Sequence, residues 1–135
     1  MQPKLDSLPA PKFRYSPARA FGPYIQTAGM VGLDPSTGAL AGGGAGEEFS
    51  QILRNLDRFL ADNALARADV VSATVYVTDF AAFGAINHVW DAHFTDDAAL
   101  PARTSVGVSA LPIGAAVEAD FLIARHETQR GEDDA

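Results

Sequence analysis

The hydrophobic residues change their spacing near residue 69, and this change restricts the fold more than any other feature. The stretch DVVSATVYVTD at residues 69–79 is rich in β-branched residues and indicates a strand. Before it, apolar residues recur at intervals of three and four, which is typical of one buried helix face: Phe49, Ile52, Leu53, Leu56, Phe59 and Leu60. A chain with both periods must pack helices against a sheet.

Further strands are expected on both sides of this region. YIQTAGMVGLD at residues 24–34 indicates a strand that ends in the turn DPSTG, where proline and glycine take favoured turn positions. Near the C-terminus, strands are expected at about residues 103–109 and 115–125, with LPIG between them. The chain therefore supplies a sheet of four to six strands.

A second helix is expected over residues 80–94, with Asp79 placed to cap it and Asn63 placed to end the first helix in a left-handed conformation. The apolar face of this second helix consists of Phe83, Ile86, Trp90 and Phe94. Two helices cannot cover both faces of the sheet, so they should pack on one face of an α+β fold.

The opposite sheet face should then remain open, which predicts an oligomer. The strands carry more apolar surface than one helical layer needs, as in Val75, Val77, Val106, Val108, Phe121 and Ile123. We expect a single domain over residues 1–135, with an extended arm at 1–12 and a disordered tail at 127–135.

Charge and composition exclude several classes of function. The formal net charge is −7, and an acidic surface repels nucleic acid. The chain has no cysteine, which removes disulfides, thiolate catalysis and cysteine metal sites and fits a reducing compartment. No stretch resembles a signal peptide or a membrane span, so we expect a soluble, cytoplasmic protein.

Two charged residues on neighbouring strands are candidates for chemistry. Arg103 is either a solvated residue at a strand end or a clamp for a carboxylate, because its guanidinium offers two parallel donors. Glu118 shares a strand face with Asp120, and it is either solvated or a buried acid at a subunit boundary that polarises a water.

Other polar residues give weaker signals. Asn87 lies on the apolar face of the second helix, where its amide serves either a structural hydrogen bond or a ligand. The histidines are poorly spaced for a shared metal, so no metal site is expected. The loop AGGGAG lacks the spacing of a phosphate-binding motif.

The C-terminal third nevertheless carries a specific signature. PARTSV followed by LPIGAAVEADFLIA resembles the RidA (YjgF) family of enamine and imine deaminases. Looser similarities run back through DVVSATVYVTDFAAFGAIN, NLDRFLADNAL and TAGMVGLDPSTG, so the resemblance begins at about residue 13.

This resemblance implies a chorismate-mutase-like fold: a six-stranded mixed sheet with two helices packed on one face. It also implies a homotrimer whose clefts lie between adjacent subunits. The implied reaction is the hydrolysis of 2-aminoacrylate and related imino or enamino acids to 2-keto acids and ammonia, without a cofactor.

The resemblance also assigns roles to individual residues. Arg103 matches the arginine that binds the substrate carboxylate, and Glu118 the glutamate that positions or activates water. Asn87 matches the helix asparagine of the substrate pocket. Ser105 replaces a frequent cysteine, at a position where the implied contact is through the backbone.

The pocket tyrosine has two candidates. Tyr24 in FGPY resembles one family motif, but YSPARAFGPYIQTAG fits the family pattern better with Tyr15 as the tyrosine. In that alignment Ala28, before Gly29, replaces a serine and removes one hydroxyl from the pocket. A non-catalytic trimer that binds keto or imino acids, or regulates through them, is therefore the rival interpretation, and an RNA-acting protein is disfavoured by the acidic charge.

Overall fold

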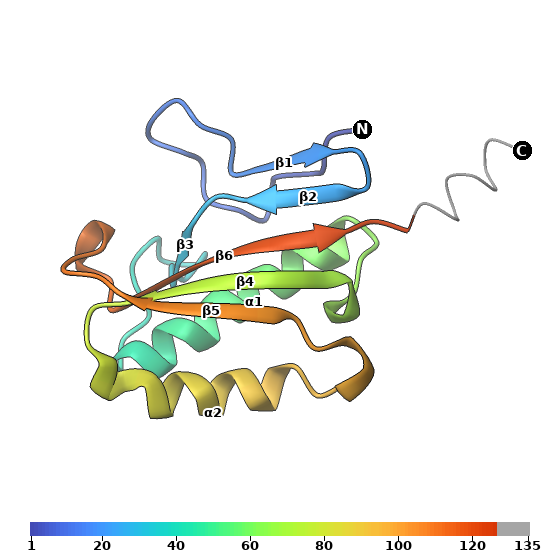
Figure 1. Ribbon diagram of the computed structural model, residues 1–135. Coiled ribbons are helices and arrows are strands. Elements are labelled where there is room, and N and C mark those ends of the chain that lie inside the picture. The colour runs from blue at the N-terminus through green and yellow to red at the C-terminus, as the bar shows by residue number, and fades with distance from the viewer. Residues whose placement is uncertain (127–135) are drawn as a thin grey trace, which may run out of the picture.

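Six strands form one mixed sheet, and the two long helices lie on the same side of it (Figure 1). The structure is a computed structural model and describes residues 1–126. The strands are β1 Ala18–Phe21, β2 Tyr24–Thr27, β3 Met30–Val31, β4 Val70–Val77, β5 Ala102–Gly107 and β6 Val117–Ala124. The helices are α1 Ala45–Asp62 and α2 Phe83–His93, with short 3-10 turns η1 Arg67–Asp69, η2 Phe80–Ala82, η3 Asp97–Ala99 and η4 Pro112–Gly114.

The order across the sheet is β1-β2-β6-β4-β5, and β3 also pairs with β6. The β4–β5 pair is parallel and the other pairs are antiparallel. These features confirm the expected α+β fold with six strands and two helices. The disordered tail expected at residues 127–135 lies outside the described residues.

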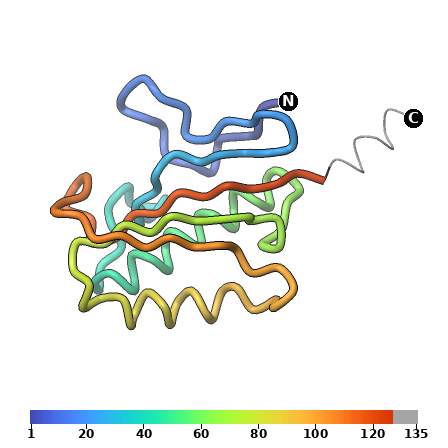
Figure 2. The backbone as a smooth tube through the Cα atoms, viewed as in Figure 1, coloured from blue at the N-terminus to red at the C-terminus, as the bar shows by residue number. Residues whose placement is uncertain are grey.

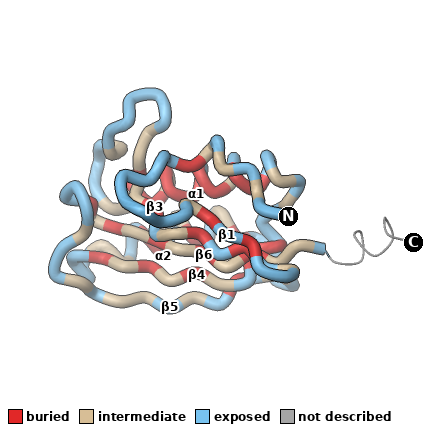
Figure 3. Tube along the Cα trace, turned by 90° about the horizontal axis from the view of Figure 1, so that it is seen from above, coloured by how far each residue is buried: buried red, intermediate tan, exposed pale blue. Residues whose placement is uncertain are grey.

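The core lies between the helices and one face of the sheet. Along β6, buried and half-buried residues alternate strictly, as the two-residue period of a strand requires (Figure 3). Four of the apolar strand residues on which the expected oligomer rested, Val75, Val77, Phe121 and Ile123, are fully buried towards the helices. Periodicity assigns residues to faces but does not say which face the helices cover.

The opposite face carries a mixed set of half-buried side chains. Within residues 1–126, no helix lies over it (Figure 1). The register of the strands places Thr74, Tyr76, Val106, Glu118, Asp120 and Leu122 there. We call this surface the open face. Among residues 1–126, no helix combines the length and apolar character needed to cross a bilayer.

The segment 24–34 differs from the single strand expected there. The strand breaks at Ala28 and Gly29, and the hydroxyl of the buried Thr27 accepts a hydrogen bond from the Phe121 backbone N–H at 3.0 Å across the break. The sequence reasoning also missed β1, whose four residues are too few to show a period. β1 pairs with β2, and β2 leads directly into the loop that contains Ala28 and Gly29, so these two strands position that loop.

The end of α1 and the N-terminal arm also differ from expectation. The left-handed residue is Ala64, with φ of 56°, because the Asn63 side chain instead bonds to the backbone of Lys4 and Phe59. The arm is therefore folded against the domain (Figure 2) rather than extended. The Gln2 amide bonds to both backbone groups of Ala20 and reinforces this contact.

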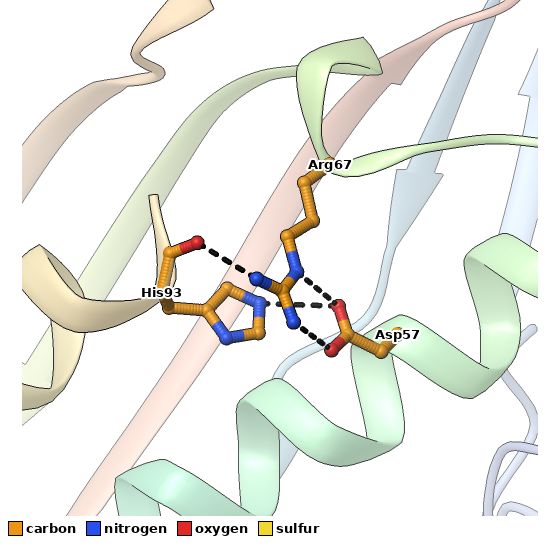
Figure 4. A network of polar contacts seen from close by, with 3 residues as sticks. All are labelled: Asp57, Arg67 and His93. Carbon is orange, nitrogen blue, oxygen red and sulfur yellow. Dashed lines mark hydrogen bonds and ion pairs between the residues drawn. The ribbon is translucent and has the colours of Figure 1, made fainter. Parts of the chain in front are cut away.

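A three-residue polar cluster connects α1, η1 and α2 (Figure 4). Asp57 accepts two hydrogen bonds from Arg67 at 3.2 and 2.9 Å, and its carboxylate lies 3.1 Å from the ring of His93. Burial lowers the pKa of His93 despite the opposing charge of Asp57, and so favours the neutral ring. With the bond from Arg67 to the His93 carbonyl, the cluster fixes the end of α2.

Close packing at Gly32 provides a test of the helix-to-sheet contact. A Cβ at this position would lie 2.4 Å from the backbone oxygen of Glu48, which cannot move without distorting α1. We expect Gly32→Ala to lower the free energy of unfolding by about 1–3 kcal/mol, the usual cost of overpacking. Urea denaturation measures the change, and Gly42→Ala, at a position with no neighbour within 4 Å, should change stability little. Equal stability of the two variants would contradict this packing.

Candidate functional site

The guanidinium of Arg103 lies between β5 and α2. Its Nη2 donates a hydrogen bond to Asn87 Oδ1 at 2.6 Å, and its central carbon lies 5.0 Å from the centroid of the Trp90 ring. Arg103 is opposite Ala73 in the parallel register, and Ala73 is buried under the helices. The Arg103 side chain therefore lies on the helix side of the sheet, at its β5 edge.

Asn87 is exposed, so its predicted place on the apolar face of the second helix is wrong. It follows the fully buried Ile86 by one helical step of about 100°, which turns the amide away from the core and towards β5. Its observed partner is Arg103 rather than a backbone loop. The structure thus joins two of the predicted site residues directly.

Ser105 follows on the same side of β5, opposite Val75. The Val108 N–H donates to Val77 O at 2.8 Å, towards β4. Because successive N–H groups of a strand alternate in direction, the N–H groups of Ser105 and Arg103 point to the free edge of the sheet. Backbone donors and a guanidinium are therefore available side by side at this edge, as an anionic ligand requires.

Glu118 lies on the open face, opposite Tyr76 of β4 and Val31 of β3. Gly29 directly adjoins its carboxyl group, since a Cβ on Gly29 would lie 2.8 Å from Glu118 Cδ. Ala28, beside it, donates its N–H to Pro17 O at 2.8 Å. The predicted residues Ala28, Gly29 and Glu118 are therefore brought together.

The environment of Glu118 favours its neutral form. Burial raises the pKa of the Glu118 carboxyl, and the nearby negative charge of Asp120 raises it further. Asp120 accepts a hydrogen bond from the Tyr76 hydroxyl at 3.0 Å, which raises the pKa of Tyr76. A glutamate whose pKa is shifted towards neutrality is suited to exchange a proton with a substrate or water.

The two tyrosines lie at different distances along the sheet from Glu118. Tyr24 pairs with Ala124, six residues along β6 from Glu118 or about 20 Å at the usual rise of a strand. Tyr15 is exposed and lies two residues before Pro17, whose carbonyl bonds to Ala28 next to Gly29. The geometry thus favours Tyr15 as the tyrosine beside the Glu118 group.

Sequence reasoning missed two residues that shape the site. It assigned Trp90 to the core alone, although the ring also lies against Arg103. It did not mark Glu48 as a buried partner, yet Glu48 Oε1 accepts a hydrogen bond from Ala116 N at 2.9 Å, just before β6. For Trp90, the sequence did contain a signal: it lies three residues after Asn87, and residues at that spacing adjoin on a helix surface.

The site residues thus form two groups separated by the sheet. Arg103, Asn87 and Ser105 lie on the helix side of the β5 edge, whereas Glu118, Gly29 and Ala28 adjoin the open face. Neither group lines the cavity of about 270 Å³ between the arm and the turn at residues 33–38. Within one chain, the two groups therefore face different sides of the sheet.

Comparisons with known proteins cover both groups. The model of the family described as Endoribonuclease L-PSP matches residues 6–125. The 2-iminobutanoate/2-iminopropanoate deaminase of Rattus norvegicus is 37% identical over 114 residues, covering 84% of this chain and 82% of the relative. A RutC family protein of Aquifex aeolicus is 34% identical over 119 residues, covering 88% and 94%.

Solved structures agree with these sequence similarities. RidA from the Antarctic bacterium Psychrobacter sp. superimposes with a TM-score of 0.83 at 30% identity, covering 92% of this chain and 98% of that one. The YjgF gene product of E. coli gives a TM-score of 0.80 at 29% identity, covering 89% and 94%. These similarities extend over β1 to β6, so both groups of site residues lie within the shared fold.

Proposed function

This chain belongs to the endoribonuclease L-PSP family, which includes RidA and YjgF, and we propose that it hydrolyses 2-imino and 2-enamino acids to 2-keto acids and ammonia. Relatives in rat, mouse and human, at 34–39% identity, are named 2-iminobutanoate/2-iminopropanoate deaminase. Small acids of the 2-aminoacrylate type are the substrates we propose here.

One observation supports this function above the others: Arg103 has no carboxylate partner within residues 1–126. Its side-chain contacts there are one hydrogen bond to Asn87 and the ring of Trp90. A guanidinium has five N–H donors, so most of them remain free to bind the two oxygens of a substrate carboxylate. The N–H of Ser105 at the sheet edge adds a further donor.

We propose that three copies form a ring, with a cleft at each boundary between two subunits. The sheet separates Arg103 from Glu118 within one chain, so a shared cleft is the arrangement that brings them to one ligand. The half-buried open face supplies surface for that contact. The absence of cysteine suits a reducing compartment, and we propose that the reaction takes place in the cytoplasm.

In the proposed mechanism, Arg103 binds the carboxylate and fixes the direction of C2. Glu118 of the neighbouring copy guides a water to C2 and takes one of its protons as the C–O bond forms. The same carboxyl returns the proton to the nitrogen, which gives a carbinolamine with a hydroxyl and an amine on C2. It then takes the hydroxyl proton and passes it to the amine, so that the C–N bond breaks, ammonia leaves and the C2–O bond becomes the carbonyl of the keto acid. Such compounds hydrolyse without a catalyst, so positioning and one proton-transfer group suffice.

Trapping of the imine provides the direct test of deamination. An amino acid oxidase generates the 2-imino acid, and semicarbazide captures what remains before hydrolysis. We expect the protein to reduce semicarbazone formation for at least one small amino acid. Unchanged semicarbazone across several amino acids, together with measurable binding of keto acids, would instead support the binding or regulatory trimer, which the loss of a hydroxyl at Ala28 favours.

A mixture of two variants that each lack one native group tests the shared cleft. We expect Arg103→Lys and Glu118→Gln proteins, unfolded and refolded together in equal amounts, to recover about a quarter of wild-type activity, because random assembly makes that share of clefts with both native groups. Each variant refolded alone serves as the control. A mixture no more active than the average of its components would contradict a cleft shared between copies, as would a monomer in light scattering.

A further inference from the structure

We propose that Trp90 is a positioning residue whose ring holds the Arg103 guanidinium in the plane and direction required for binding a carboxylate. The inference rests on the proposed function, because it concerns the same anion-binding group. It gives Trp90 a second role beside its packing in the core, through its contact with Arg103.

The distance between the two groups supports a direct attraction. The Arg103 central carbon lies 5.0 Å from the Trp90 ring centroid, within the range of about 6 Å for a cation–π contact. Among aromatic side chains, tryptophan attracts cations most strongly. Since Arg103 is only partly exposed, the contact is less weakened by water than one on an open surface.

The ring itself is held by the core. Trp90 is 8% exposed, and its ring is stacked on that of Phe49, with centroids 6.4 Å apart and planes 11° apart. The Phe94 ring also packs against the Trp90 ring, with their centroids 4.4 Å apart and their planes at 47° to each other. Phe49 is fully buried in α1, so a continuous series of aromatic contacts connects the core to the guanidinium.

Asn87 supplies the second constraint on Arg103. The ring restricts the tilt of the guanidinium, while the bond from Nη2 to Asn87 Oδ1 restricts its rotation within its plane. Asn87 and Trp90 are three residues apart on α2 and therefore adjoin each other on its surface. Together they leave the remaining N–H groups in a fixed direction, which reduces the ordering needed when a carboxylate binds.

The test measures binding of pyruvate, a stable 2-keto acid, by calorimetry to the intact protein. Trp90→Leu keeps an apolar side chain but removes the π surface, and we expect it to weaken pyruvate binding about fivefold. Trp90→Phe restores an aromatic face and should recover most of the affinity. Phe94→Leu is the matched control: it removes a ring from the same stack and leaves the Trp90 face against Arg103 in place, so it should lower Tm but weaken pyruvate binding clearly less than Trp90→Leu.

A second readout uses the fact that Trp90 is the single tryptophan of the chain. Pyruvate should change the tryptophan fluorescence of the wild type and of Phe94→Leu, but not of Arg103→Gln. Equal affinities of Trp90→Leu and wild type, or equal losses in Trp90→Leu, Trp90→Phe and Phe94→Leu, would overturn the positioning role. Failure of the wild type to bind pyruvate would overturn it together with the carboxylate site, whereas binding without imine turnover would overturn deamination alone.

Discussion

Replacing Glu118 by Gln is expected to reduce kcat/KM for 2-aminoacrylate by about a hundredfold, the usual scale for loss of a proton-transfer group. Glutamine preserves the size of the side chain next to Gly29 and can still bind a water, but it cannot accept or return a proton. The imine-trapping assay measures the loss. A variant with near-wild-type activity would exclude Glu118 from proton transfer.

The dependence on pH sharpens this prediction. Because burial and Asp120 raise the pKa of Glu118, the carboxyl loses its proton at a higher pH than an ordinary glutamate. Activity that needs the ionised form should therefore fall as the pH is lowered through this raised pKa. Asp120→Asn, which removes one of the two causes, should move the fall to lower pH, and Glu118→Gln should abolish it.

Stability should respond in the opposite direction. Between the ordinary and the raised pKa of Glu118, the folded chain binds more protons than the unfolded chain, so the free energy of unfolding decreases as the pH rises through that window. Above the window, Glu118→Gln should consequently be at least as stable as the wild type. Chemical denaturation at two pH values checks this, and a marked loss of stability would mean that the carboxylate serves the fold instead.

Much of the fold could be predicted because its main elements show clear periods. The apolar residues of α1 and the β-branched residues of β4 each specify one element. Asp79 accepts a hydrogen bond from Ala81 N at 2.9 Å, but it caps the 3-10 turn η2 that leads into α2, which begins three residues later than expected. The break at Ala28 was not predictable in this way, since it depends on Thr27 bonding to a strand almost a hundred residues later. Local patterns contain no information on such distant partners.

The site shows the same division. The sequence resemblance selected Arg103 and Glu118, and strand alternation correctly grouped Glu118 with Asp120. Whether Arg103 and Glu118 share a face of the sheet depends on the register of β4 with both neighbours, which no single segment encodes. The two residues lie on opposite sides of the sheet, so the proposed trimer is needed to unite the proposed site.

Replacing Arg103 by Lys is expected to reduce kcat/KM by about tenfold or more, mainly through a higher KM. Lysine keeps the positive charge but loses the planar pair of donors that matches two carboxylate oxygens. It also loses the geometry of the 2.6 Å bond to Asn87 and part of the contact with Trp90. The imine-trapping assay across a range of substrate concentrations separates the effect on KM from that on kcat.

The fold should tolerate this change, which makes the result specific to binding. Within the described residues Arg103 forms no ion pair, so its replacement leaves no buried carboxylate without a partner. Arg58→Lys, an identical change at an exposed position of α1, is the control and should preserve both Tm and kcat/KM. If Arg103→Lys retained wild-type activity, charge alone would be enough for binding, and the role of a planar clamp held by Asn87 and Trp90 would be refuted.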